Sequence, residues 1–154
     1  MDFDRVFYDS IRKKFPLEEN DRDFGSDGGW IDYYIKENVP SIYVEDGEEY
    51  ENLTSITVDV FDVDPSWEYE DGSFYEDFGN GMERCDSGSG YVLDGLSCDT
   101  DTRFFNDGDE ITIEKFAKIN GIPMDELKVL VEVAKKYASG DYESWAEDNL
   151  EYND

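Results

Sequence analysis

The stretch TSITVDVFDVD, residues 54–64, decides the fold of this chain. In an extended strand, Ile56, Val58 and Val60 would share one face, while polar residues such as Asp59 would share the other. A strand with one apolar and one polar face is typical of an antiparallel sheet that covers a core on one side. We therefore expect residues 54–64 to form a half-buried strand of an antiparallel sheet.

The same stretch contains an irregularity. After Val60 the apolar positions move by one residue, to Phe61 and Val63. Because side chains along a strand alternate with a period of two, this slip predicts a bulge or a sharp bend near residues 60–61, or else cover on both faces.

Turn signals divide the neighbouring sequence into further short elements. Strands are predicted over residues 41–44, 73–78, 90–94 and 102–105, with turns at residues 45–47 and 106–109. Helices are predicted over residues 2–15, 30–39, 112–120 and 124–138, with a final helix capped by Asp141 and a loop over residues 18–29. The expected fold class is α+β, with N-terminal helices, a twisted antiparallel sheet of four to five strands and a C-terminal helical segment. Residues 1–110 are expected to be an acidic α+β domain, and residues 111–154 a helical segment packed on the same core.

Residues 113–130 resemble a helix-turn-helix pair. Ala117 and Gly121 are four apart, and Leu127 and Leu130 stand where the second helix would pack back on the first. That second helix opens with Met-Asp-Glu, where a DNA-reading helix carries Arg, Lys, Asn or Gln. We interpret the pair as a packing unit. The helical pair could also support dimerisation or host contacts. Alternatively, it could bind operator DNA through Lys115, Lys118 and Lys128.

The charge of the chain is lopsided. Acidic residues outnumber basic residues by 41 to 13, for a net charge of −28. Residues 41–110 hold 21 Asp and Glu against two arginines, so this segment alone contributes 19 of those negative charges. A compact domain of this length is about 40 Å across, and duplex DNA of that length carries about 23 charges. The chain thus approaches the charge density of DNA, which argues against direct binding to DNA or to anionic lipid.

Aromatic residues oppose the disorder that such a charge would otherwise indicate. Eleven of the 24 aromatic residues fall inside the acidic segment, among them Tyr43, Phe61, Trp67 and Phe104. Each aromatic side chain buries roughly 150 to 250 Å² in a core. We therefore expect the acidic segment to be folded.

Composition also bounds the location and chemistry of the chain. No apolar run approaches the roughly 18 residues of a membrane span, and the start does not resemble a secretory signal, so we expect a cytoplasmic protein of a bacterial host. Cys85 and Cys98 are then expected to be reduced thiols, although turns could bring them together. Without histidine, a Ser-His-Asp triad is impossible and an ordinary zinc site is nearly excluded. We expect no catalytic residues, no metal and no cofactor.

The acidic residues of the predicted sheet are spaced so as to form a row. Residues two apart on a strand lie about 6.6 Å from each other on one face. With no lysine between Lys36 and Lys115 to alternate with them, these carboxylates are interpreted as an interaction surface. The predicted partner-binding residues are Asp59, Asp62, Asp64, Glu68, Glu70, Asp71, Glu76 and Asp77. A secondary acidic surface is predicted at Glu45, Asp46, Glu48, Glu49, Glu143, Glu147, Asp148 and Glu151.

In this acidic set the chain resembles, as a class, the small DNA-mimic inhibitors encoded by phages and mobile elements, namely anti-CRISPR and anti-restriction proteins. The resemblance lies in the acidic residues from Glu45 to Asp77 and in the acidic C-terminal helix. It implies a non-catalytic inhibitor that lays carboxylates where phosphates would go. Its partner would be a basic DNA- or RNA-binding host protein, such as a CRISPR effector or a restriction enzyme.

Two alternatives accompany this hypothesis. The first is an immunity protein or antitoxin that neutralises a basic nuclease, for which the physical argument is the same. The second is a calcium-binding or adaptor module, because the sequence from Asp99 begins like an EF-hand loop. Phe104, however, stands where that loop requires glycine.

Overall fold

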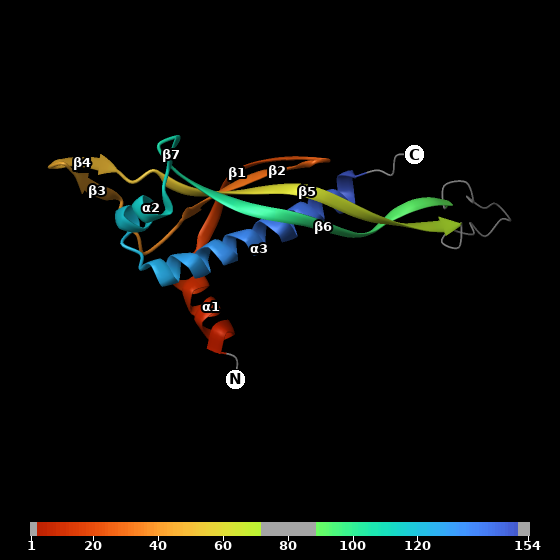
Figure 1. Cartoon of the computed structure of the whole chain (residues 1–154), viewed down its shortest axis with the longest axis horizontal. Coiled ribbons are helices and arrows are strands. Elements are labelled where there is room, and N and C mark those ends of the chain that lie inside the picture. Colours follow the sequence, from red (N-terminus) through yellow and green to blue (C-terminus); the bar gives the residue numbers. More distant parts are fainter. Residues whose placement is uncertain (1–2, 72–88, 151–154) are drawn as a thin grey trace, which may run out of the picture.

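The computed structural model describes residues 3–71 and 89–150, with side chains for residues 5–69 and 91–150. A five-stranded antiparallel sheet, in the order β1-β2-β5-β6-β7, carries its helices on one face, and a separate two-stranded hairpin lies at one end (Figure 1). The strands of the main sheet are β1 (Leu17–Gly25), β2 (Gly28–Ile35), β5 (Thr54–Asp71), β6 (Ser89–Asn106) and β7 (Asp109–Ile111). The hairpin is β3 (Ile42–Glu45) and β4 (Glu48–Glu51), and the helices are α1 (Phe3–Lys14), α2 (Ile113–Asn120) and α3 (Met124–Asn149). The predicted α+β class is confirmed.

The core lies between the sheet and α3. Ile56 and Val58 are fully buried on β5, as the alternation in residues 54–64 predicts. They belong to one hydrophobic cluster that includes Ile11 of α1 and the fully buried Leu130 and Tyr142 of α3. This single cluster therefore spans residue 110, the boundary expected between the acidic domain and the helical segment.

The bulge predicted near residues 60–61 is present. Phe61 pairs with Asp99, but the next paired residue of β5 is Asp64, which lies opposite Ser97. One extra residue thus sits in β5, and Asp62 there has a left-handed backbone with φ of 50°. A second shift follows between Ser66 and Trp67, this time with the extra residue in β6.

The helix predicted over residues 30–39 and the loop predicted over residues 18–29 are wrong. They form β2 and β1, which pair with each other and, through β2, with β5. Ile31, Tyr33 and Ile35 are buried at a spacing of two, which is a strand pattern. Trp30 and Tyr34, which are also apolar, made the same segment fit a helical pattern. Pairing with β5 decides between the two patterns, because strand preference depends on tertiary context.

Two predicted breaks are also wrong. The strand candidates at residues 90–94 and 102–105 are parts of the single strand β6, which stays paired with β5 through Gly95. The helix predicted to close at Ser139-Gly140 instead continues as α3, whose buried face includes both Ala138 and Tyr142. At Gly140, burial of α3 on both sides outweighs the modest cost of glycine in a helix, and at Gly95 the pairing with β5 keeps the strand continuous. The strand candidate at residues 73–78 lies outside the described residues.

The helical pair at residues 113–130 packs as predicted. Thr112 caps α2 by accepting a hydrogen bond from the Lys115 backbone, and Gly121 ends it with φ of 65°. Phe116, Leu127 and Leu130 are buried in the core. Asn120, also buried, exchanges hydrogen bonds with Asn52 and Thr54 and so fixes α2 to the start of β5. Within the described part of the chain, no helix has the length and apolar character needed to cross a membrane.

Gly140 tests whether α3 is continuous. Replacing it with alanine should raise the free energy of unfolding by about 0.5 to 1 kcal/mol, because alanine loses less entropy in a helix and no atom lies within 4 Å of the new Cβ. Gly121→Ala is the matched control, and its φ of 65° should make it destabilising by about 1 to 2 kcal/mol. Urea unfolding followed by circular dichroism measures both. Destabilisation by Gly140→Ala would mean that the chain leaves the helix at that residue.

Candidate acidic interaction face

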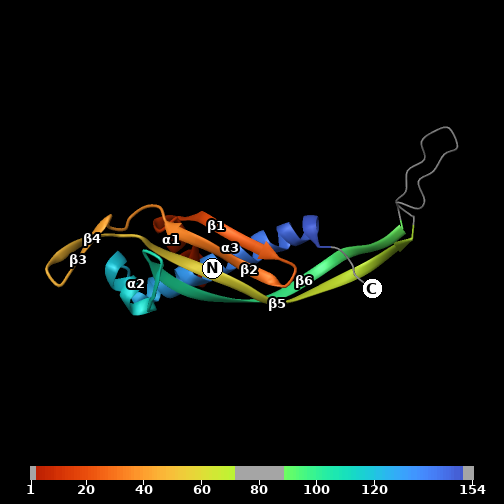
Figure 2. The same ribbon diagram turned by 90° about the horizontal axis from the view of Figure 1, so that it is seen from above.

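Among the residues that the structure describes, no helix lies on the face of the sheet opposite α3, and we call this face the open face (Figures 1 and 2). Because Ile56, Val58 and Val60 point into the core, the residues between them point to the open face. The register then places Trp30 beside Asp59 and Asp59 beside Asp101. One step along the sheet, Asp32 lies beside Thr57 and Thr57 beside Arg103.

The bulge in β5 determines which carboxylates share the open face. Asp59 and Asp64 are five residues apart, so in a regular strand they would point to opposite faces. The extra residue at the bulge restores Asp64 to the open face, opposite Ser97, and Glu68 follows it there, opposite Val92. Asp62, at the bulge itself, is exposed. The irregularity that the apolar pattern revealed therefore aligns the acidic row.

Strand β6 contributes carboxylates that were not among the predicted interaction residues. Asp99 and Asp101 are exposed, lie two residues apart, and face Phe61 and Asp59 across the ribbon. Their spacing of two was the available signal, but the same residues were considered as the start of an EF-hand loop. We use the term acidic ribbon for the exposed carboxylates of Asp62, Asp64, Glu68, Asp99 and Asp101.

The acidic ribbon belongs to a long two-stranded element formed by β5 and β6. Each of its strands has 18 residues, which corresponds to about 60 Å at roughly 3.3 Å per residue. That length equals about 17 base pairs at roughly 3.4 Å per base pair along each DNA strand. The far end of the β5–β6 hairpin extends beyond α3 and the other strands as a two-stranded arm (Figures 1 and 2). On the opposite side of this arm, the rings of Tyr69 and Tyr91 pack edge to face at 5.3 Å.

Arg103 is the one basic residue on β5 or β6. Its Nε and Nη2 donate hydrogen bonds to the two carboxylate oxygens of Asp59, at 2.7 and 2.8 Å. Its guanidinium also lies 5.2 Å from the ring centre of Phe105. The hydrogen bond to Asp59 raises the pKa of Arg103 above its usual value. Asp59, predicted as a partner-binding residue, is therefore occupied by an internal ion pair.

The other predicted acidic residues are dispersed. Glu70 and Asp71 pair in β5 with Gly90 and Ser89, and their side chains are not described. Glu76, Asp77 and Glu151 lie outside the described residues. In the secondary acidic surface, the exposed positions lie far apart, on the β3–β4 hairpin (Glu45, Asp46, Glu48, Glu49) and near the C-terminal end of α3 (Glu143, Glu147, Asp148). The structure therefore does not gather that surface into one patch.

The structure bears on the calcium-binding alternative and on the environment of Cys98. The segment that resembled the start of an EF-hand is part of β6, not a loop. Among the side chains that the structure describes, no three His, Cys, Asp or Glu residues are grouped to hold a metal ion. Burial, together with Asp99 and Glu143, raises the pKa of the Cys98 thiol. Cys85 lies outside the described residues, so the expectation that both cysteines are reduced thiols stays a prediction.

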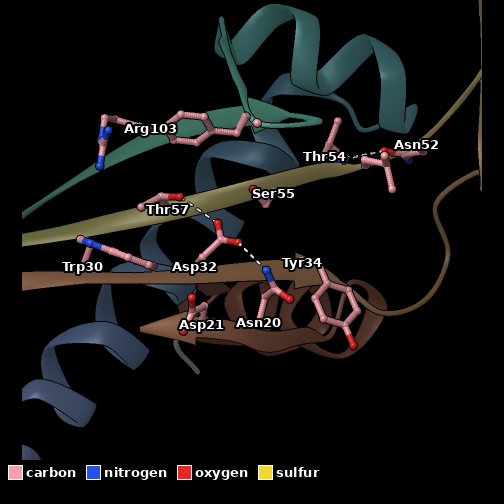
Figure 3. A pocket seen from close by; sticks show the side chains of 13 residues that line it. Asn20, Asp21, Trp30, Asp32, Tyr34, Asn52, Thr54, Ser55, Thr57 and Arg103 are labelled. Carbon is pink, nitrogen blue, oxygen red and sulfur yellow. Dashed lines mark hydrogen bonds between the residues drawn. The ribbon is translucent and has the colours of Figure 1, made fainter. Parts of the chain in front are cut away.

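Beside the acidic ribbon the open face is hollowed, over a volume of about 630 Å³ (Figure 3). Small residues of the central strand β5, Ser55 and Thr57, are flanked by larger side chains of the neighbouring strands. The hollow is lined by Asn20, Asp21, Trp30, Asp32, Tyr34, Asn52, Leu53, Thr54, Ser55, Thr57, Arg103, Phe105 and Gly108. The sequence did not predict it, because its β1 and β2 residues were assigned to a loop and a helix.

Comparison with protein-family models, with curated proteins and with solved structures finds no match to this chain. Its function is therefore inferred from its own charge and geometry.

Removing the Arg103–Asp59 ion pair and removing the like-charge pair of Asp59 and Asp101 should change the free energy of unfolding in opposite directions. Arg103→Gln should lower the free energy of unfolding by about 1 kcal/mol, because a well-formed bidentate pair is lost and Asp59 is left facing Asp101. Asp101→Asn should raise the free energy of unfolding by roughly 0.5 kcal/mol, because it relieves a cross-strand like-charge pair. Both effects should shrink in 1 M NaCl, where the screening length is about 3 Å. Two changes of the same sign in urea unfolding would disprove this assignment.

Proposed function

We propose that this chain is a non-catalytic, acidic DNA-mimic inhibitor that occupies the nucleic-acid-binding cleft of a host defence complex. The observation that supports the proposal is the acidic ribbon, in which Asp64 and Glu68 of β5 share one face of a long two-stranded element with Asp99 and Asp101 of β6. Its partner is a basic DNA- or RNA-binding protein of a bacterial host, of the CRISPR effector or restriction enzyme type. In the partner's cleft, carboxylates take the positions of phosphates.

The spacing of the ribbon supports this function better than its total charge does. Open-face positions recur every roughly 6.6 Å along each strand. Five of the ten positions from the Asp59–Asp101 pair to the Glu68–Val92 pair hold carboxylates, namely Asp59, Asp64, Glu68, Asp99 and Asp101. The sheet holds these positions in place, so the partner need not order them on binding. Pre-ordering of this kind reduces the entropic cost of association.

The shape of the arm supports the same function. Paired strands lie about 4.8 Å apart, so a two-stranded ribbon is a thin element that can enter a cleft. Glu68 projects from one side of the arm, while Tyr69 and Tyr91, which are 56% and 46% exposed, lie on the other. Aromatic side chains of this kind are enriched in protein interfaces. The arm would thus combine electrostatic steering on one side with apolar contact on the other.

A ribbon variant tests this function. Replacement of Asp62, Asp64, Glu68, Asp99 and Asp101 by Asn or Gln removes five of the 28 net charges and leaves the Arg103–Asp59 pair intact. The matched control removes five charges from the β3–β4 hairpin, by replacing Glu45, Asp46, Glu48, Glu49 and Glu51. At about 0.2 to 1 kcal/mol per exposed ion pair, the ribbon variant should bind its partner about five- to several-thousandfold more weakly.

The readout is the plating of phage on bacteria that carry restriction or CRISPR systems and express the chain. Wild type and the hairpin control should restore plating on at least one such strain, and the ribbon variant should not. Equal rescue by the ribbon variant would refute the assigned face. An absence of rescue on every strain, with protection against a co-expressed nuclease toxin instead, would favour the immunity-protein alternative.

A further inference from the structure

The hollow on the open face has a floor and two walls. Ser55 and Thr57 of β5 form the floor, and Thr57 is only 6% exposed because taller neighbours surround it. Trp30 of β2 and Arg103 of β6 stand on either side of β5 toward one end (Figure 3). Phe105 continues the β6 wall, beside Ser55. The hollow therefore has aromatic rings on both walls and polar groups on its floor.

Asp32 projects into this hollow from β2. Its Oδ1 accepts a hydrogen bond from Thr57 Oγ1 at 2.8 Å, and its Oδ2 accepts one from Asn20 Nδ2 at 3.1 Å (Figure 3). Both donors are neutral, and Asp32 takes part in none of the ion pairs between the described residues. Asp21 lines the same wall. The hollow thus holds carboxylate charge that the chain's own cations do not balance.

On the β6 wall, the side chain of Arg103 gives an example of a guanidinium held by a carboxylate and an aromatic ring. The Arg103 side chain joins a bidentate carboxylate contact, to Asp59, with an aromatic contact, to the ring of Phe105. Trp30 and Asp32 offer the same two components, a ring and a carboxylate, two residues apart on β2. They lie next to Asp59 and Thr57 in the register, so the two sets are neighbours.

We propose that the hollow holds the side chain of an arginine from the basic partner, stacked on Trp30 and hydrogen-bonded to Asp32. This inference rests on the proposed function, and it adds a specific anchor point beside the ribbon. Arginine suits the hollow better than lysine does, because a planar guanidinium both stacks on aromatic rings and binds a carboxylate through two parallel hydrogen bonds. Buried arginine and tryptophan contacts are also those that dominate many protein interfaces.

A peptide titration tests the anchor without the partner. The probe is acetyl-Gly-Arg-Gly-amide, added at low salt to the ¹⁵N-labelled full chain, and the readout is the indole N–H signal of Trp30 in two-dimensional NMR. The signal, assigned with Trp30→Phe, should shift and saturate, while the indole signals of Trp67 and Trp145 should not. The same peptide with citrulline, the neutral isostere of arginine, should cause no shift, and a lysine peptide should bind more weakly.

Asp32→Asn should weaken the arginine peptide roughly tenfold, because a charge-assisted hydrogen bond becomes a neutral one. Asp27→Asn, an exposed change of the same charge in the β1–β2 turn, should stay within about twofold of wild type, since distant exposed charges are screened. Equal shifts with citrulline, equal shifts at all three indoles, or equal effects of the two variants would overturn the proposal. The citrulline comparison keeps the test decisive even if Asp32→Asn does not fold.

The peptide result and the plating result separate the two proposals. Peptide binding at Trp30 with no effect of the ribbon variant on plating would support the arginine anchor and refute the acidic ribbon as the binding face. If the ribbon variant loses rescue and the arginine peptide does not bind, the acidic ribbon is supported as the binding face and the arginine anchor is refuted.

Discussion

The alternation of side chains along β5 is the constraint on which the rest of the structure depends. Ile56, Val58 and Val60 must face one way to bury their apolar surface against α3, so Thr57 and Asp59 must face the other. Because β5 pairs with β2 on one side and β6 on the other, it imposes the same division on the central part of the sheet. A chain with a net charge of −28 can fold in this way because one face supplies the core while the other keeps its carboxylates in water.

The bulge at Asp62 extends that division beyond the core. It shifts the alternation by one residue, so that Asp64 and Glu68 join the face of Asp59 while Val63 keeps contact with the core cluster. A regular strand would have placed these carboxylates on the helix side. The proposed binding face and the hydrophobic core therefore depend on the same one-residue irregularity, which gives the bulge a functional interpretation within the proposal.

The sequence correctly predicted those elements that depend on the local pattern of residues. The strand over residues 54–64, its bulge, the end of α2 at residue 120, and the turns at Asp46-Gly47 and Asp107-Gly108 all follow from side-chain period or turn chemistry. It failed where partners far along the chain decide. The polar strand β1 exists because β2 pairs with it, and Trp30 and Asp32 belong to a hollow only once that pairing is known. Asp99 and Asp101 carried a local signal, their spacing of two, but only the β6 register places them beside the acidic residues of β5.

In the proposed function, the acidic ribbon takes the place of nucleic acid in a basic cleft. The most direct test of this function is an equilibrium competition between the chain and duplex DNA for the purified partner, once phage plating has identified that partner. Strict competition is predicted, in which the apparent dissociation constant of the chain rises linearly with DNA concentration and the ribbon variant competes weakly. A ternary complex, in which chain and DNA bind the partner together without loss of affinity, would contradict the account.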